Sequence, residues 1–359
     1  MNNYEANSID NLTPSEGLEL QLNNEGTGYI VVGKGSCSDT NIVIPSTYSN
    51  LPVTEIGKGA FKEDCGNGII SVYIPRGVTV IGDHAFLSCT GLSKITISDS
   101  VTKIGAYVFS DCTALVDVTL PRGLKEIDKG AFMGCRSLEK IAIPNGVKRL
   151  NCDTFALCAG LREVSIPESV EDIDNFALLC CENLESITVD ENNEHYRSID
   201  GNLYSKDGSV LILYGAGKDA EEFRLPIDVT KIGYGAFAGC KNLRSISIPD
   251  RVTEIEKEAF SGCEALESVL LPNGITRIAS DTFFGCVSLE CITIPKSVRY
   301  INSGALRANM IIFEDTKNWK VVGGGFFSGI SKGLLSNPVK AAEAFSHGKY
   351  ADASIEKKS

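Results

Sequence analysis

Cysteine is the residue type whose number and spacing here give most scope for chemistry, because a thiol can form a disulfide, bind zinc or act as a nucleophile. The chain has 359 residues and 13 cysteines. Eight of them end a short run such as AFLSC or AFMGC, and within two series they follow one another at intervals of 23 residues. These eight are Cys89, Cys112, Cys135, Cys158, Cys181, Cys240, Cys263 and Cys286.

Cysteines at one repeated position are explained first by packing. The same small, soft side chain beside Phe in every repeat predicts a column of buried thiols. Disulfides between neighbouring repeats are a second interpretation, but side chains in register in a parallel stack point the same way, which is poor disulfide geometry. Zinc is a third, although the repeated cysteines lack a C-x-x-C pair and a histidine at a fixed offset. The redox state of the other five stays open: Cys37, Cys65, Cys152, Cys180 and Cys291.

The remaining reactive residues form no pattern typical of catalysis. His84, His195 and His347 lie far apart in the sequence, and none belongs to a triad or a metal motif. His84 occupies a variable position of the repeat and is expected to be exposed. The glycines of VGKGSC (32–37) lack the helix and the Lys-Ser/Thr of a phosphate-binding loop. We therefore expect no catalytic residue, no metal site and no cofactor.

The elements that position these residues repeat together with the cysteines. The full unit reads L-x-x-I-x-I-P-x-x-V-T-x-I-x-x-x-A-F-x-x-C-x-x. Its I-x-I part alternates at period two and predicts a strand with one buried face, which Pro then ends. V-T-x-I predicts a second short strand, and A-F-x-x-C predicts a tight turn. One unit cannot bury its apolar edge alone, so the array predicts a repeat solenoid with short parallel strands.

The unit resembles the BspA-like leucine-rich repeat, a 23-residue bacterial and protist class. The resemblance lies in the Ile-x-Ile-Pro, Val-Thr-x-Ile-Gly and Ala-Phe-x-x-Cys segments and extends over about residues 17–313. It implies a leucine-rich-repeat right-handed β-solenoid with capped ends. It also implies a non-catalytic protein-binding solenoid, presented at the cell surface or secreted, and involved in adhesion or in recognition of host or partner proteins.

The repeat pattern predicts six segments along the chain. They are a tail (1–16), a hairpin cap (17–45), coils (46–190), an antiparallel hairpin insert (191–222), further coils (223–313), and a C-terminal cap with a short helix and tail (314–359). Two Asp-Gly pairs, at 200–201 and 207–208, predict the turns of the insert. We expect the last residues, 349–359, to be frayed.

Two sets of residues are candidates for protein binding. The insert carries aromatic and Arg side chains of the kind that binding hot spots favour: His195, Tyr196, Arg197, Tyr204 and Tyr214. The outward column of the first strand carries charges of both signs before the insert: Lys94, Asp117, Lys140 and Glu163. After the insert the same column holds small, neutral residues. Two plainer interpretations stay open, namely an insert that is a structural variation common in the family and a strand face that is merely solvated.

The charge balance restricts the class of partner. The formal charge of −12, from 46 acidic and 34 basic side chains, disfavours nucleic acid, whose binders present a basic stripe. No apolar run reaches the roughly 18–20 residues that span a bilayer, and the N-terminus MNNYEANSID lacks the features of a secretory signal. The expected partner is a protein, from a host or from the cell itself. The missing leader and the many thiols favour the alternative of a cytoplasmic scaffold or regulatory module, and the sequence leaves the ligand and the oligomeric state open.

Overall fold

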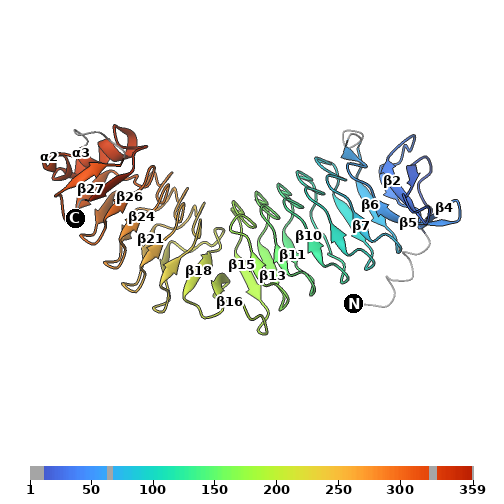
Figure 1. Ribbon diagram of the computed structural model, residues 1–359, viewed down its shortest axis with the longest axis horizontal. Coiled ribbons are helices and arrows are strands. Elements are labelled where there is room, and N and C mark those ends of the chain that lie inside the picture. Colours follow the sequence, from blue (N-terminus) through green and yellow to red (C-terminus); the bar gives the residue numbers. More distant parts are fainter. Residues whose placement is uncertain (1–11, 63–67, 323–329, 358–359) are drawn as a thin grey trace. The chain divides into compact units, whose positions relative to one another are not determined.

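The computed structural model describes residues 12–62, 68–322 and 330–357, and the chain divides into two compact units, Met1–Cys181 and Glu182–Ser359. In each unit the backbone winds into coils, and short strands of successive coils pair in parallel (Figure 1). Each unit is therefore a parallel β-solenoid, and the fold class predicted from the repeat is confirmed.

The I-x-I segments of the first unit form what we term its long-strand sheet. Its strands are β3 (Asn41–Val43), β6 (Ser71–Ile74), β8 (Lys94–Ile97), β11 (Lys140–Ala142) and β13 (Glu163–Ile166). Equivalent residues pair across it, as Ser71 does with Lys94. Between β8 and β11, Asp117 makes isolated bridges to Lys94 and to Lys140. The register therefore continues through this coil, although its backbone forms no assigned strand there.

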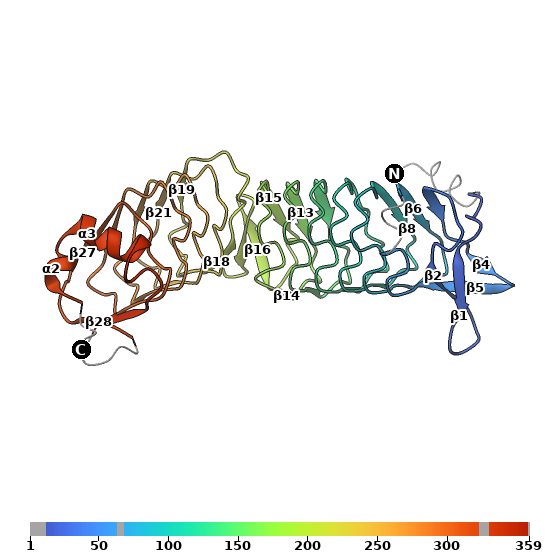
Figure 2. The same ribbon diagram turned by 90° about the horizontal axis from the view of Figure 1, so that it is seen from above.

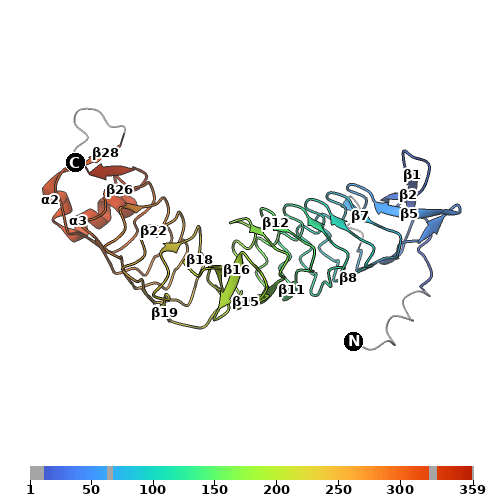
Figure 3. The ribbon, with the colours of Figure 1, turned by 60° about the horizontal axis from the view of Figure 1, so that its bottom comes forward.

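The V-T-x-I segments form a second sheet of shorter strands, the short-strand sheet. In the first unit its strands are β5 (Leu51–Ile56), β7 (Val80–Ile81), β9 (Lys103–Ile104), β10 (Glu126–Ile127), β12 (Arg149–Leu150) and β14 (Asp172–Ile173). At the N-terminal end, β1 (Glu19–Leu22) and β2 (Tyr29–Gly33) form an antiparallel pair, and β2 also pairs in parallel with β5 (Figure 3). A further strand, β4 (Thr47–Tyr48), is antiparallel to β5. The hairpin thus covers the open edge of the first coil.

The second unit begins with β15 (Ser186–Val189) and an antiparallel meander. The meander consists of β16 (Tyr196–Ile199), β17 (Asn202–Ser205) and β18 (Val210–Leu213). Between β16 and β17, Asp200 and Gly201 have φ angles of 51° and 72°. Two successive residues with positive φ are the geometry of a type I′ hairpin turn, which Asp-Gly favours. The last strand of the meander, β18, pairs in parallel with the next coil and so leads the chain back into the solenoid.

The coils of the second unit repeat the two sheets of the first. The long strands are β19 (Glu222–Arg224), β21 (Ser245–Ser247), β23 (Ser268–Leu270), β25 (Cys291–Ile294) and β27 (Met310–Phe313). The short strands are β20 (Lys231–Ile232), β22 (Glu254–Ile255), β24 (Arg277–Ile278) and β26 (Tyr300–Ile301). Seen from above, the coils of the unit stand side by side (Figure 2).

The C-terminal cap contains helical turns and two strands. They are β28 (Trp319–Val321), α2 (Lys332–Leu335), α3 (Pro338–Ala342), the π-helical turn η2 (Glu343–His347) and β29 (Ile355–Lys357). The expectation that residues 349–359 are frayed is wrong for residues 349–357, which are the part of this segment that the structure describes. Ile355 is 1% exposed, and β29 pairs antiparallel with both β26 and β28. The reason is that the last coil leaves an open strand edge, which this segment covers.

Stacked phenylalanines run through the core of each unit. Each Phe of the A-F-x-x-C turn lies on the Phe of the next coil, with ring centroids 5.0–5.6 Å apart. The stacked residues are Phe61, Phe86, Phe109, Phe132 and Phe155 in the first unit and Phe237, Phe260 and Phe283 in the second, all 0% exposed. Offset stacks of this kind add to the stabilisation that comes from burying apolar area.

Charged side chains on the short-strand sheet pair between neighbouring coils. Lys103 lies 2.8 Å from Glu126, and Lys148 lies 2.5 Å from Glu171, measured from Nζ to the carboxylate oxygen. The partners are 23 residues apart in both pairs. Because the four side chains are 40–63% exposed, each pair contributes at most about 1 kcal/mol. The pairs therefore align coils that the core already holds together.

The residue before the repeated cysteine adopts a left-handed conformation in coil after coil. Gly134, Gly239, Gly262 and Gly285 have φ angles of 71–76°. Other coils place Ser88 or Asp111 there, at 60° and 58°. Side chains with a Cβ are strained in this region, so glycine is the residue that fits best. The Gly-Cys pair of the repeat therefore reflects backbone geometry as well as packing.

Gly239→Ala tests this backbone requirement. A Cβ at residue 239 would meet no atom within 4 Å, so only the φ of +75° opposes it. We expect the free energy of unfolding, measured by urea titration, to fall by about 1 kcal/mol. The matched control is Gly333→Ala in α2, where space is also open and φ is not left-handed. Alanine favours a helix there, so stability should stay equal or rise. A loss at both positions would contradict the explanation.

Candidate functional site

The outer side of the long-strand sheet in the first unit carries the predicted charge column. Along β8, Ile95 and Ile97 point inward and are buried, whereas Lys94 is exposed. The four predicted charges are all exposed and lie in register on successive coils: Lys94, Asp117, Lys140 and Glu163. The structure therefore brings this candidate set together. Since parallel strands lie about 4.8 Å apart, positive and negative charges alternate along a surface that one partner could span.

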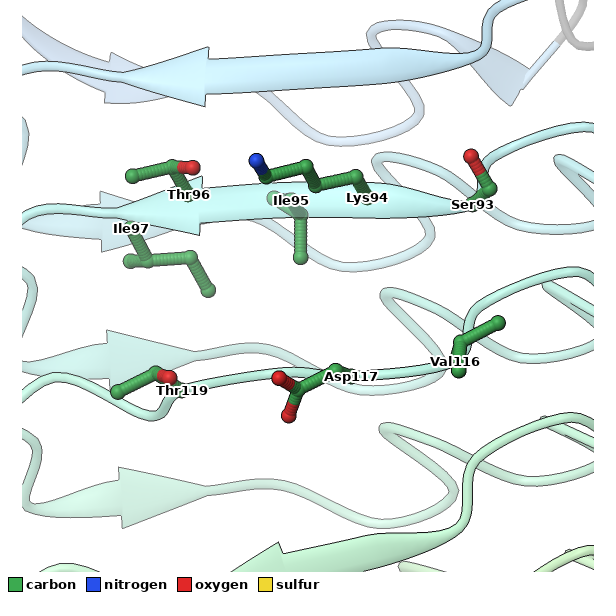
Figure 4. Close-up of a pocket in the computed structure, with 8 residues that line it drawn as sticks. All are labelled: Ser93, Lys94, Ile95, Thr96, Ile97, Val116, Asp117 and Thr119. Atoms are coloured by element: carbon green, nitrogen blue, oxygen red, sulfur yellow. The ribbon is translucent and has the colours of Figure 1, made fainter.

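A groove opens on this face beside the coil that lacks an assigned strand. It has a volume of about 460 Å³ and lies between β8 and the segment 116–119. Lys94 and Asp117 lie at its middle, and the hydroxyls of Thr96 and Thr119 lie at one end (Figure 4). The groove coincides with the isolated bridges at Asp117. The groove thus opens where the regular pairing of the long strands is interrupted.

The same face of the second unit differs in chemistry. Leu270 is 74% exposed, and on the last long strand Met310 and Ile312 are 41% and 38% exposed. Cys291 pairs with Met310, and Thr293 pairs with Ile312. The expected small, neutral column consists of Ser245, Ser268 and Cys291, and on β27 it is continued by Met310, with Ile312 beside it, two apolar residues that the sequence prediction did not include. The signal was present in the sequence, since the same two-residue alternation across MIIF places Met310 and Ile312 outward.

Two of the five candidate residues on the insert are not on the surface. Tyr204 is 0% exposed and Tyr214 is 2% exposed, which contradicts their expected role as exposed anchors. The Tyr214 ring lies 5.1 Å from that of Phe237 and 4.7 Å from that of Phe223. The physical reason is that the meander replaces a coil and must supply the apolar layer on which the phenylalanine stack of this unit begins. Burial accordingly raises the pKa of Tyr204 and of Tyr214 to about 12.

The other three insert candidates lie together at the start of β16. His195 and Arg197 are exposed and Tyr196 is half-buried. Asn193, which is 0% exposed, accepts hydrogen bonds through its side-chain oxygen from the N–H groups of His195 and Tyr196, at 2.9 and 2.8 Å. A buried amide therefore fixes the backbone of this corner. The accessible part of the predicted insert site is reduced to these three residues.

The hydroxyl of Tyr214 gives a test of its burial. It is enclosed and has no hydrogen-bond partner among the described residues. An unsatisfied buried hydroxyl costs about 1–3 kcal/mol, so Tyr214→Phe should raise the free energy of unfolding by about 1 kcal/mol in a urea titration. The control is Tyr234→Phe, because the Tyr234 hydroxyl donates to Glu258 Oε1 at 2.6 Å. That variant should be no more stable than the parent, and a loss of stability in Tyr214→Phe would show that its hydroxyl is paired.

The eight repeated cysteines form a buried column, each at most 3% exposed. Six of their thiols also donate a hydrogen bond to the carbonyl oxygen of the Phe one coil earlier, over 3.0–3.2 Å. These pairs are Cys112 with Phe86, Cys135 with Phe109, Cys158 with Phe132, Cys181 with Phe155, Cys263 with Phe237 and Cys286 with Phe260. The thiol thus fills space as a small apolar group would and also supplies a weak donor that alanine lacks.

Cys89 departs from the prediction of a column of thiols, because it is disulfide-bonded. The other seven column cysteines are thiols, so its bond leads out of the column. This agrees with the geometric reason against disulfides within the column, where aligned side chains do not point toward one another. Among the residues outside the column, Cys37 is buried, Cys152 and Cys291 are half-buried and Cys180 is exposed. Cys65 lies outside the described residues.

Burial also determines how reactive the thiols are. It raises the pKa of Cys112 and of Cys158 to about 12 and also raises that of Cys135 well above its usual range. Since the thiolate is the nucleophile and the metal ligand, these side chains are inert at neutral pH. The pKa of Cys152 rises to about 11, first through burial and then through its contact with Asp153.

Alkylation should separate the column from the surface. We expect iodoacetamide at pH 8, without reductant, to modify Cys180 rapidly because it is exposed. Cys112, Cys135 and Cys158 should be modified only after unfolding in urea, because in the folded chain they are buried and protonated. Peptide mass spectrometry distinguishes the sites. Modification of the column thiols in the folded protein at the rate of Cys180 would contradict their burial.

The three histidines lie in different segments of the fold. His84, expected to be exposed, is half-buried, and its ring stacks on that of Tyr107 at a centroid distance of 5.5 Å. His195 lies in the meander and His347 ends η2. Within the part of the chain that the structure describes, no three His, Cys, Asp or Glu side chains gather in a way that could hold a metal ion. Nor does that part contain a helix long and apolar enough to cross a membrane.

The stacked coils, with inward Leu, Ile and Phe columns and a parallel sheet facing outward, define a leucine-rich-repeat protein. The chain belongs to the BspA-type leucine-rich repeat family. The model of that family, described as a BspA type leucine rich repeat region with six copies, matches residues 35–135, 79–207 and 215–332.

Several solved structures are similar to this chain. A leucine rich cell surface protein from Faecalibacterium prausnitzii A2-165 is 30% identical, with 83% of this chain and 86% of that chain covered and a TM-score of 0.64. A leucine-rich repeat protein from Bacteroides ovatus ATCC 8483 is 27% identical, with coverages of 85% and 88% and a TM-score of 0.55. The pneumococcal vaccine antigen PcpA, 20% identical, shares the fold, with coverages of 86% and 83% and a TM-score of 0.63. No curated protein matches the chain.

Proposed function

We propose that this protein is a non-catalytic binding module that is presented at a cell surface and takes part in adhesion or in recognition of host or partner proteins. One observation carries the proposal. The buried positions of the long strands are nearly the same in every coil, whereas the outward positions change, from Lys94 and Asp117 in one unit to Ser268 and Met310 in the other. Packing dictates the first set and leaves the second free to suit a ligand.

Two further observations support a binding role at a surface. The similar F. prausnitzii structure, at 30% identity, is of a leucine rich cell surface protein. The disulfide at Cys89 favours an oxidising compartment, where such bonds persist. For the non-catalytic part, the support is that the column thiols are protonated and the three histidines lie in different segments of the fold.

The alternative is an intracellular scaffold or regulatory module. The observation that favours it is the large set of cysteines that are thiols, seven of them in the column alone. Many reduced thiols suit a reducing compartment. Limited proteolysis of intact source cells separates the two, because a surface protein is cleaved and an intracellular one is protected.

An adhesion assay tests the proposed function directly. Beads coated with the full chain are incubated with cultured epithelial cells and, separately, with beads carrying the same chain. The test variant replaces the four charges of the first-unit face by serine: Lys94→Ser, Asp117→Ser, Lys140→Ser and Glu163→Ser. We expect adhesion to fall about tenfold, because hot-spot contacts would be lost while the core is untouched.

The matched control removes the same charges from the short-strand sheet. It carries Lys103→Ser, Glu126→Ser, Lys148→Ser and Glu171→Ser, so both variants lose two cations and two anions and keep the same net charge. Circular dichroism must show both folded. The control should adhere like the parent, and equal losses in the two variants, or no adhesion of the parent to either partner, would overturn the proposal.

A further inference from the structure

The outer face of β23, β25 and β27 carries a cluster that we term the apolar strand patch. It consists of Leu270, Cys291, Thr293, Met310 and Ile312. Cys291 pairs with Met310 and Thr293 with Ile312, so these side chains stand on adjacent strands, about 4.8 Å apart. Val269, which precedes Leu270, pairs with Ile292 and places Leu270 beside them. The patch is therefore continuous over three strands.

The packing of the second unit does not account for this patch. The helical turns of the C-terminal cap lie beside β27 (Figure 2). On the inner side of that strand, the ring of Phe345 lies 5.8 Å from that of the inward Phe313. Met310 and Ile312, which alternate with the inward residues, remain 41% and 38% exposed, and Leu270 remains 74% exposed. Clustered apolar side chains on a surface, rimmed by polar residues, mark interaction sites.

A small cavity continues the patch toward the turn after the long strands. It has a volume of about 170 Å³, and its walls include Leu270, Thr293, Pro272 and Pro295. Since about 10–15 Å³ of such space is enough for one water, the cavity has room for several waters and so for one aliphatic side chain. The flat patch and the hollow together offer a surface for several residues and a socket for one of them.

Two carboxylates flank the cavity, those of Asp250 and Glu314. Glu314 is held in place because its Oε2 accepts a hydrogen bond from the backbone N–H of Lys296 at 2.9 Å. The nearby cation Arg251 is already paired with Asp228 at 3.1 Å. Within the part of the chain that the structure describes, neither Asp250 nor Glu314 forms an ion pair. A cationic group of a partner would complement them.

We propose that the apolar strand patch and its cavity bind an extended segment of a partner protein that carries Leu, Ile or Val next to Lys or Arg. The aliphatic side chain occupies the cavity, and the cation faces Asp250 and Glu314. Three strands about 4.8 Å apart span about 10 Å, the length of about three residues of extended chain, which favours a short segment over a globular surface. The inference rests on the proposed function and specifies a partner chemistry for the second unit.

A peptide array tests the docking site. Ten-residue peptides of Ser and Gly carry one Leu, Ile or Val followed by Lys or Arg, and matched sets replace the cation by Glu or the aliphatic residue by Ser. The labelled full chain is applied, and affinities of the best peptides are measured by fluorescence anisotropy. We expect binding to the aliphatic and basic set, weakened about tenfold in either matched set, and weakened also by added salt.

Variants locate the binding on the chain. Leu270→Ser and Glu314→Gln should each weaken the best peptide about tenfold, and Glu314→Gln should also reduce the salt dependence. The matched control is Ile227→Ser, which removes an aliphatic side chain that is 69% exposed in the same unit but outside the patch. It should bind like the parent. Equal binding by all three peptide sets, no binding by any, or unchanged binding in Leu270→Ser would overturn the docking site.

Two outcomes separate this inference from the proposed function. Peptide binding by a chain whose beads adhere to nothing would overturn the adhesive function and support the docking site. Adhesion without peptide binding would support the adhesive function and overturn the docking site. The patch could instead be occupied by a second copy of this chain, which sedimentation of the free chain tests. A dimer that dissociates in Leu270→Ser would show that a second copy occupies the patch and would overturn the peptide proposal.

Discussion

The carbonyl oxygen of Phe86 accepts two hydrogen bonds, one from the N–H of Cys89 in its own coil at 3.1 Å and one from the thiol of Cys112 in the next coil at 3.2 Å. The same arrangement recurs along each unit, beside rings stacked 5.0–5.6 Å apart. No coil can satisfy these groups or bury this face alone, so each coil depends on its neighbour. A buried cysteine, small enough for the column and able to donate, meets both conditions at once.

This constraint separates the roles of the two sides of each long strand. Inward residues must fit the column, and they change little from coil to coil. Outward residues do not have to fit the column, and they differ in chemistry between the two units. The first unit presents alternating charges and a groove at the coil of Asp117, whereas the second presents the apolar strand patch with two carboxylates beside it. One frame thus carries two surfaces of different chemistry.

The meander shows how the same constraint acts where the repeat is broken. Its strands run antiparallel, but Tyr214 lies on Phe223 and Phe237 and so provides the layer that a regular coil would have supplied. An insert that interrupts a solenoid must still cover the core on the coil that follows it. Its aromatic residues are consequently divided between packing, as for Tyr204 and Tyr214, and the surface, as for His195.

The sequence by itself determined the fold, because a period of 23 residues with alternating strands and a fixed Phe and Cys admits few structures other than stacked coils. It also determined which strand positions face outward, and so the column of Lys94 and Asp117. Only the tertiary structure decided which aromatic side chains of the insert are buried, that Cys89 in the column is disulfide-bonded, and that a groove opens at Asp117. These features arise where the repeat is irregular, and there a side chain's environment depends on neighbours distant in sequence, which no local pattern encodes.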